Sequence, residues 1–190
     1  MKGGEDLRLD QRVQQLFTIM NSIFASDPSC ENRDLNIKTF KVVPVSNRLG
    51  IFEWVDNTEP LKALISKEHK NLENGADIHE SRAYRLRETW LQKVAKSDGL
   101  KNANIAHMHL SVLKLDEKSV VKAFNQHKAA MPNYLLRNAL ENLCLNSSAF
   151  LTIKNQFIKS MAVFSVASYL IGIGDRHLEN FLIDTTDGEL

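Results

Sequence analysis

The sequence predicts an α+β fold that is mostly helical and carries a small antiparallel sheet. Two observations predict it: apolar residues recur at helical spacing along most of the chain, and two runs rich in β-branched residues flank a short turn. The chain has 190 residues, of which 43% are hydrophobic, so it can bury a core of its own. That length suits one domain or a piece of a larger one.

The first half of the chain predicts a helix, a hairpin and a second helix. We expect an amphipathic helix over residues 6–24 that stops at Asp27-Pro28, then strands over residues 37–45 and 49–55. Residues 58–65 then begin a short helix with Pro60 in its first turn. The apolar stripe of the first helix consists of Val13, Leu16, Phe17, Met20, Ile23 and Phe24.

The second half is helical. Residues 66–104 are polar, with breakers at Asn74-Gly75 and Asp98-Gly99 and one helix whose stripe is Leu86, Trp90, Leu91 and Val94. Further helices are expected from Pro132 and from Ser147. Residues 159–171 are apolar nearly all round, which predicts a central, fully buried helix.

Composition excludes several classes of protein. The formal net charge is +1, so neither a basic arm nor an acidic tail carries the function. Cys30 and Cys144 stand far apart, which excludes a disulfide scaffold or zinc finger and favours a reducing compartment. His107 and His109 have no carboxylate or cysteine nearby and are interpreted as an incidental pair. The longest apolar run, residues 161–174, is shorter than the about 20 residues of a membrane span, so no membrane partner is expected.

The most informative stretch follows the predicted buried helix. Gly174 is followed by Asp175, Arg176, His177 and Asn180, and then by an apolar strand over residues 181–183. Burial of so many polar groups is costly without partners, so we expect a loop at the edge of a cleft. An Asp followed five residues later by an Asn suits phosphoryl transfer.

In that chemistry Asp175 would orient the acceptor hydroxyl and accept its proton, and Asn180 would be a ligand of Mg²⁺. His177 would stabilise the charge that develops on the phosphoryl oxygens. The alternative is structural: Asp175 and Arg176 form an ion pair at a helix end and His177 is a satisfied core imidazole.

Three stretches resemble one family. Gly174 to Asn180 reads Gly-Asp-Arg-His-x-x-Asn and resembles the catalytic loop of the phosphatidylinositol 3-kinase-related kinases, which inverts the His-Arg-Asp order of ordinary protein kinases. Residues 2–10 resemble the family's Lys-x-x-Glu/Asp-Asp-Leu-Arg-Gln-Asp, with Leu9 where Gln is usual. The resemblance implies that Lys2 contacts the ATP phosphates and that Asp10 holds this lysine.

The third stretch, residues 42–55, resembles the strand and hinge that link the two lobes of these kinases. The resemblance implies that Trp54 packs on adenine, that the backbone of Val55 hydrogen-bonds the edge of the base, and that Leu182 forms the floor beneath it. The alternative is that Trp54 is a core aromatic residue.

The resemblance implies a protein-kinase-like two-lobed fold of the PI3/PI4-kinase type. Residues 1–55 would form part of the N-lobe, and residues 56–190 the C-lobe up to the catalytic loop. In the family a phosphate-covering loop precedes the lysine and an Asp-Phe-Gly follows the catalytic loop, and neither is in this sequence. We therefore expect a fragment of a kinase domain, truncated at both ends and inactive by itself.

The implied reaction is transfer of the ATP γ-phosphate, with Mg²⁺, to Ser or Thr of proteins. The hinge resembles most the branch that repairs DNA double-strand breaks by non-homologous end joining. That branch implies a nuclear location, with the Ku heterodimer and DNA ends as partners through regions outside these residues. Two alternatives stay open: a lipid kinase of the phosphatidylinositol 3- or 4-kinase type, and a non-catalytic kinase-like interaction module.

Overall fold

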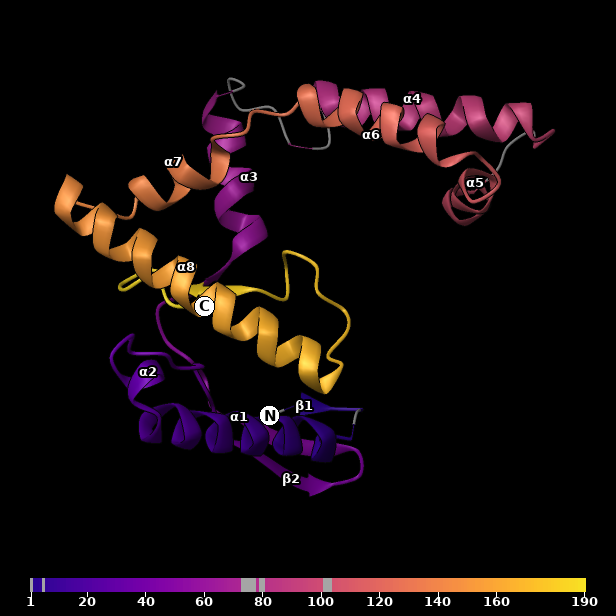
Figure 1. Ribbon diagram of the computed structural model, residues 1–190. Helices are drawn as coiled ribbons and strands as arrows, with labels where there is room; N and C mark the ends of the chain where they lie inside the picture. The colour runs from indigo at the N-terminus through magenta and orange to yellow at the C-terminus, as the bar shows by residue number, and fades with distance from the viewer. Residues whose placement is uncertain (1, 5, 73–77, 79–80, 101–103) are drawn as a thin grey trace. The chain divides into compact units, whose positions relative to one another are not determined.

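The computed structural model describes residues 2–4, 6–72, 78, 81–100 and 104–190 (Figure 1). The chain forms two compact units. Unit 1 consists of Met1–Leu64 and Ala139–Leu190, and unit 2 consists of Ile65–Asn138. The helices are α1 (Arg8–Ser26), α2 (Pro28–Glu31), α3 (Leu61–Leu72), α4 (Arg82–Ser97), α5 (Ile105–Val112), α6 (Glu117–Ala129), α7 (Leu135–Glu141) and α8 (Ser147–Ile171). The strands are β1 (Lys2–Gly3), β2 (Val42–Ser46), β3 (Leu49–Phe52), β4 (Thr58–Pro60) and β5 (Leu182–Asp184).

The first helix is confirmed, with both ends two residues later than predicted. Asp27 then accepts hydrogen bonds from the backbone N–H groups of Ser29 (2.8 Å) and Cys30 (3.1 Å), so the predicted stop is also the N-cap of α2. The predicted apolar stripe is too wide, because Leu16 and Ile23 are exposed. The core of unit 1 uses a narrower set, and its buried members are Phe17, Ile37 and Ala167, packed against Val13, Met20, Phe24, Val163, Phe164, Ile171 and Ile173.

The predicted antiparallel hairpin is present as β2 and β3, with Val42 opposite Phe52 and the turn at Asn47-Arg48. The N-terminal strand β1 adds to the other side of β3, with Lys2 opposite Gly50. Gly50 is required there, since a Cβ would come within 2.5 Å of the side chain of buried Leu7.

The strand predicted from residue 37 begins only at Val42. Side chains of α1 instead form hydrogen bonds with the backbone of the residues that precede Val42. Asn21 donates to the carbonyl of Ile37 (2.8 Å) and accepts from its N–H (2.9 Å), and Gln14 accepts from the N–H of Phe40 (3.1 Å). These bonds give the backbone of Ile37 and the N–H of Phe40 the partners that a sheet would otherwise supply.

The helix predicted from residue 58 begins later, at Leu61. Thr58–Pro60 is extended because it forms β4, which pairs with β5 more than a hundred residues further along the chain. The residue before a proline also prefers an extended backbone. The N–H of Leu61 donates to the carbonyl of Phe181 (2.8 Å), so α3 starts directly beside the segment that leaves the predicted catalytic loop.

The last helix, α8, is one continuous helix of 25 residues. Its N-cap is Asn146 rather than Ser147, and it ends at Gly172, whose φ of 69° is the left-handed conformation that suits glycine. The prediction of a fully buried helix over residues 159–171 is wrong. Ala167 lies in the core, but Tyr169 (87% exposed) and Leu170 (70%) do not, because within unit 1 only one face of α8 packs on α1.

Unit 2 contains α4, α5 and α6, and α4 packs against the other two (Figure 1). Ser81 caps α4 by accepting from the N–H of Tyr84 (3.2 Å). Leu91 and Val94 are buried as the apolar stripe predicts, Ala95 is buried beside them, and Leu86 is partly exposed. The predicted break at Asp98-Gly99 ends α4, whereas Asn74-Gly75 lies outside the described residues.

The helix expected from Pro132 is present as α7 but begins at Leu135, after a turn. Its apolar residues Leu135, Ala139 and Leu140 are buried. Within the described part of the chain, no helix is long and apolar enough to cross a membrane.

Candidate functional site

Unit 1 contains a cavity of about 670 Å³. One wall comes from α1 and the segment after it, and the other comes from the end of α8 and the loop that follows. The lining residues are Leu9, Asp10, Val13, Gln14, Phe17, Lys38, Phe40, Val55, Thr58, Phe164, Ile171, Gly172, Ile173, Gly174, Arg176, Asn180, Phe181, Leu182, Glu189 and Leu190. The volume lies within the range of small-molecule sites, and apolar walls with a few polar groups are typical of them.

The predicted catalytic loop is closed by Asn180. Its side-chain N–H donates to the backbone carbonyl of Asp175 (2.8 Å) and to the Asp175 carboxylate (3.2 Å). Its own backbone N–H donates to the carbonyl of His177 (2.9 Å). These bonds hold Asp175 at a φ of 56°, a left-handed conformation that is uncommon for residues other than glycine. The two residues predicted to act together are therefore in direct contact.

His177 lies between two carboxylates on the same loop. Its Nε2 is 3.7 Å from Asp175 Oδ1, and its Nδ1 is 3.8 Å from Glu179 Oε2. Glu179 also forms an ion pair with Lys62 at the start of α3 (2.6 Å), and that hydrogen bond holds the pKa of Glu179 below its ordinary value. The backbone N–H of Lys62 donates to the carbonyl of Leu178 (3.0 Å), so α3 fixes the middle of the loop.

Arg176 anchors the loop from the opposite side. Its guanidinium lies 4.8 Å from the centre of the Phe164 ring on α8, a cation–π contact. Phe164 in turn packs against Phe17 of α1 and Phe181, each with ring centres 6.0 Å apart. Desolvation at this place lowers the pKa of Arg176 from its ordinary value. The loop is thus attached to the hydrophobic core of unit 1.

The structure brings four of the predicted site residues to this cavity: Asp10, Val55, Asn180 and Leu182. Asp175 and His177 lie on the same loop with exposed side chains. Trp54 is 85% exposed and does not line the cavity. The backbone of Lys2 pairs with Gly50, and its side chain lies outside the described part of the chain. The roles assigned to these residues remain predictions.

Sequence reasoning missed three charged residues of the lining: Lys38, Arg176 and Glu189. Arg176 stands inside the catalytic-loop motif, so its position gave a signal, although its partner Phe164 could not be predicted. Lys38 lies in a run with strand-like composition, and nothing in that run marks it. Its partner, Asp184, is 146 residues away.

The residues present fit a nucleotide and a divalent cation. The aromatic and aliphatic lining suits a flat base, and the lining also includes the polar residues Asp10, Arg176 and Asn180. Oxygen donors such as the Asn180 amide and the Asp175 carboxylate suit Mg²⁺. No group of three or more His, Cys, Asp or Glu residues able to hold a metal occurs in the described ranges. A cation here would therefore be coordinated partly by protein oxygens and partly by the phosphate oxygens of the nucleotide.

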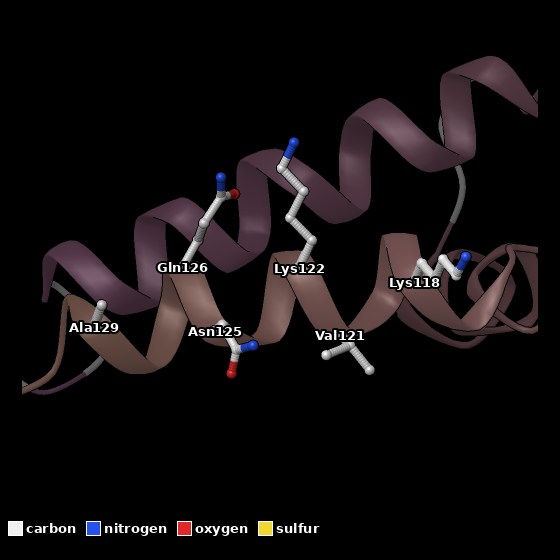
Figure 2. Close-up of a pocket in the computed structure, with 6 residues that line it drawn as sticks. All are labelled: Lys118, Val121, Lys122, Asn125, Gln126 and Ala129. Carbon is white, nitrogen blue, oxygen red and sulfur yellow. The ribbon is translucent and has the colours of Figure 1, made fainter.

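Unit 2 has a second hollow, of about 580 Å³, and its lining comes from α6 alone: Lys118, Val121, Lys122, Asn125, Gln126 and Ala129 (Figure 2). Figure 2 shows that the side chains of Lys122 and Gln126 point to one side of the helix and those of Val121 and Asn125 to the other. Because these groups diverge, they do not form a common site for one ligand.

Comparison with known proteins places these features in a family. The model of the phosphatidylinositol 3- and 4-kinase family matches residues 1–190. The DNA-dependent protein kinase catalytic subunits of Dictyostelium discoideum and Xenopus laevis are 39% and 37% identical over 100% and 99% of the chain. The serine/threonine-protein kinase TEL1 of Candida glabrata is 29% identical over 98% of the chain and has 6% of its own length covered. The chain spans 4% of each of the two DNA-dependent protein kinase subunits.

A solved structure, the FAT and kinase domain of CtTel1, superposes with a TM-score of 0.74 at 20% identity, covering 99% of this chain and 12% of that one. The likeness confirms the predicted α+β fold of the kinase type. The family match over the whole chain confirms the resemblance seen in the three sequence motifs.

Proposed function

The chain belongs to the phosphatidylinositol 3- and 4-kinase family, and we propose that it supplies the nucleotide cavity and catalytic loop of a kinase that phosphorylates Ser or Thr in proteins. One observation carries the proposal. The loop in which Asn180 holds Asp175 borders a cavity whose lining also includes Asp10 of α1 and Val55. ATP is the nucleotide that this family implies.

In this proposal Asp175 orients the acceptor hydroxyl and accepts its proton. His177, close to the Asp175 carboxylate, stabilises charge on the phosphoryl oxygens. Asn180 turns its amide nitrogen toward Asp175, so its amide oxygen is the group available to Mg²⁺. When bound, the cation neutralises charge on the phosphates.

The remaining site residues hold the nucleotide. In this proposal Lys2 contacts the ATP phosphates and Asp10 holds that lysine in place. The backbone of Val55 forms hydrogen bonds with the edge of the adenine. The carbonyl of Val55 accepts from Thr58 Oγ1 (3.0 Å), which fixes the hinge backbone. Leu182 forms the floor of the cavity, and Trp54 packs on the base. Because Trp54 is exposed without ligand, this last role requires its indole to swing inward when ATP binds.

For the whole protein we propose the role of a DNA-dependent protein kinase catalytic subunit. Identity to those relatives, 39% and 37%, exceeds the 29% to TEL1. The proposal includes double-strand-break repair by non-homologous end joining, a nuclear location, and recruitment to DNA ends by the Ku heterodimer. We place the lobe boundary after residue 55. We also expect little transfer from these 190 residues alone, because neither a phosphate-covering loop nor an Asp-Phe-Gly is among them.

The test inserts the chain into a relative. The 190 residues replace the matching segment of the Dictyostelium discoideum protein, and transfer from labelled ATP is measured to Ser peptides and to phosphatidylinositol vesicles. We expect label on the peptide, and a loss of about 10²- to 10⁴-fold in kcat for Asp175→Asn because the proton acceptor is removed. Asp56→Asn, an exposed carboxylate outside the cavity lining, is the control.

The other outcomes decide against the proposal. Label on the lipid instead of the peptide would favour a phosphatidylinositol kinase. A folded chimera that labels neither acceptor would favour a non-catalytic interaction module.

A further inference from the structure

The charged residue Lys38 lines the cavity, and the proposed reaction assigns it no role. Lys38 follows α1 and precedes the sheet, and it lines the cavity on the α1 side. The backbone on both sides of it is fixed to α1, through Asn21 at Ile37 and Gln14 at Phe40. The base of the Lys38 side chain therefore moves with α1 and with Asp10 on that helix.

The ammonium group of Lys38 reaches the other wall. Its Nζ is 2.5 Å from Asp184 Oδ2 and 4.0 Å from Glu189 Oε2. Both partners are well shielded, since 28% of the Lys38 side chain and 10% of the Asp184 side chain are exposed. Burial works against the charge on Asp184, but hydrogen bonds from Lys38 and Thr186 outweigh it and hold the pKa of this carboxyl below its ordinary value.

Asp184 organises the turn that follows β5. Its Oδ1 accepts from the backbone N–H of Thr186 (2.9 Å) and from Thr186 Oγ1 (2.5 Å). Its own N–H donates to the carbonyl of Glu189 (2.8 Å), and its carbonyl accepts from Gly188 (2.9 Å). The carboxylate that receives Lys38 is therefore rigidly placed, and β5 connects it through Leu182 to the loop that carries Asn180.

The two walls of the cavity come from chain segments more than a hundred residues apart, and Lys38 joins them by an ionic contact. Buried ion pairs contribute little to net stability compared with apolar residues of the same shape. What a charged pair of defined geometry does supply is a fixed distance between the elements that carry it. Here those elements are α1 with Asp10 and the β5 turn next to the catalytic loop.

We infer that Lys38 and Asp184 are a positioning pair that sets the width of the nucleotide cavity between α1 and the catalytic loop. The inference rests on the proposed function in that the ligand is a nucleotide. Neither residue touches the reacting atoms, so loss of the pair raises KM for ATP and leaves kcat at saturating ATP nearly unchanged.

The experiment compares four variants of the 190-residue chain: Lys38→Met, Asp184→Asn, the charge exchange Lys38→Asp with Asp184→Lys, and Lys159→Met as control. Lys159 also forms a short ion pair, 2.6 Å from Asp34, with 24% of its side chain exposed, but it does not line the cavity. The first readout is the dissociation constant of Mg·ATPγS by calorimetry. The second is hydrogen exchange of the backbone amides of Asp184, Thr186 and Gly188, which needs no nucleotide.

We expect Lys38→Met and Asp184→Asn to weaken binding about 10- to 100-fold, since each leaves a buried charge without its partner. The charge exchange restores only part of the loss, since it rebuilds the ion pair but removes the acceptor of Thr186. Lys159→Met leaves binding within about twofold of the original chain because its exposed partner is solvated. Exchange of the three turn amides accelerates in Lys38→Met and Asp184→Asn. It also accelerates in the charge exchange, because Asp184→Lys removes the carboxylate that accepts from Thr186, and it stays unchanged in Lys159→Met. In the chimera, Lys38→Met and Asp184→Asn raise KM for ATP and keep kcat.

The outcomes separate the two proposals. Binding that is unchanged in a folded Lys38→Met chain overturns the positioning pair and leaves the kinase proposal standing. If the original chain binds no nucleotide, the kinase cavity is refuted. In that case the hydrogen-exchange rates test the positioning pair by themselves. Equal exchange rates of the Asp184, Thr186 and Gly188 amides in Lys38→Met and Lys159→Met would reject it.

Discussion

The two compact units differ in how far apart in the sequence their partners lie. In unit 2, α4 packs on α5 and α6, which follow it within a few dozen residues. In unit 1, Met1–Leu64 packs on Ala139–Leu190, and the Phe17–Phe164 and Lys38–Asp184 contacts join these segments. The cavity and the catalytic loop lie in unit 1. The comparison teaches that the proposed chemistry depends on long-range assembly, whereas unit 2 is a locally folded helical insertion between its two halves.

The largest expected effect comes from the two cores. Phe17→Ala in unit 1 and Leu91→Ala in unit 2 each remove a buried side chain, which costs about 3–5 kcal/mol for Phe and about 2–5 kcal/mol for Leu. Urea unfolding measures both losses. Only Phe17→Ala is expected to abolish nucleotide binding, because Phe17 lines the cavity and supports Phe164. Equal loss of binding in Leu91→Ala would show that the cavity depends on unit 2.

Helix caps give a smaller, matched effect in both units. Asn146 caps α8 by accepting from the N–H of Ala149 (2.9 Å), and Ser81 caps α4 in the same way. Replacing either residue by Ala leaves a helix N–H without its acceptor and costs about 1 kcal/mol. Urea unfolding is the measurement, with Asn146→Asp and Ser81→Asp as controls that keep the cap. A cap variant as stable as the original chain would contradict these assignments.

Acid pH gives the smallest effect and again compares the units. Hydrogen bonds from Lys38 and Thr186 lower the pKa of Asp184 against the effect of burial, and a hydrogen bond from Lys114 lowers that of Asp98 in unit 2. A lowered pKa means that the folded chain holds the charged form. Each group therefore adds stability above its unfolded pKa of about 3.9, and that stability is lost as the pH falls through the folded value.

Unfolding followed from pH 6 down to pH 2 (a range of about four units around the carboxyl pKa) measures this loss. Asp184→Asn and Asp98→Asn are each expected to make the free energy of unfolding depend less on pH. The effect is larger for Asp184→Asn because its ion pair is shielded from water. A steeper curve in either variant would contradict the sign.

Local patterns were sufficient where the structure itself is local. The helix over Arg8–Ser26 and the β2–β3 hairpin follow from spacing, β-branched composition and turn residues, and the catalytic-loop motif marked Asp175 and Asn180 before any fold was known. The motif also located the cavity wall to which Asn180 and Leu182 belong.

Distant partners account for what the sequence could not predict. The strand at Thr58–Pro60 exists because β5 pairs with it, and Lys38 has its proposed role because it forms an ion pair with Asp184. The exposed Tyr169 on α8 has the same cause: apolar composition shows that a helix can be buried, and only the packing shows which face is. Trp54 was placed by resemblance to a hinge, and its indole lies in solvent.

The most direct measurement of the central claim is a titration of the chain with Mg·ATP, followed residue by residue by the NMR shifts of the backbone amides. The cavity in unit 1 predicts saturable shifts at Asp10, Val55, Asn180 and Leu182 and unmoved amides along α6. No saturable shift, or shifts confined to Lys118 and Lys122 in the hollow of unit 2, would contradict the assignment of this cavity to a nucleotide.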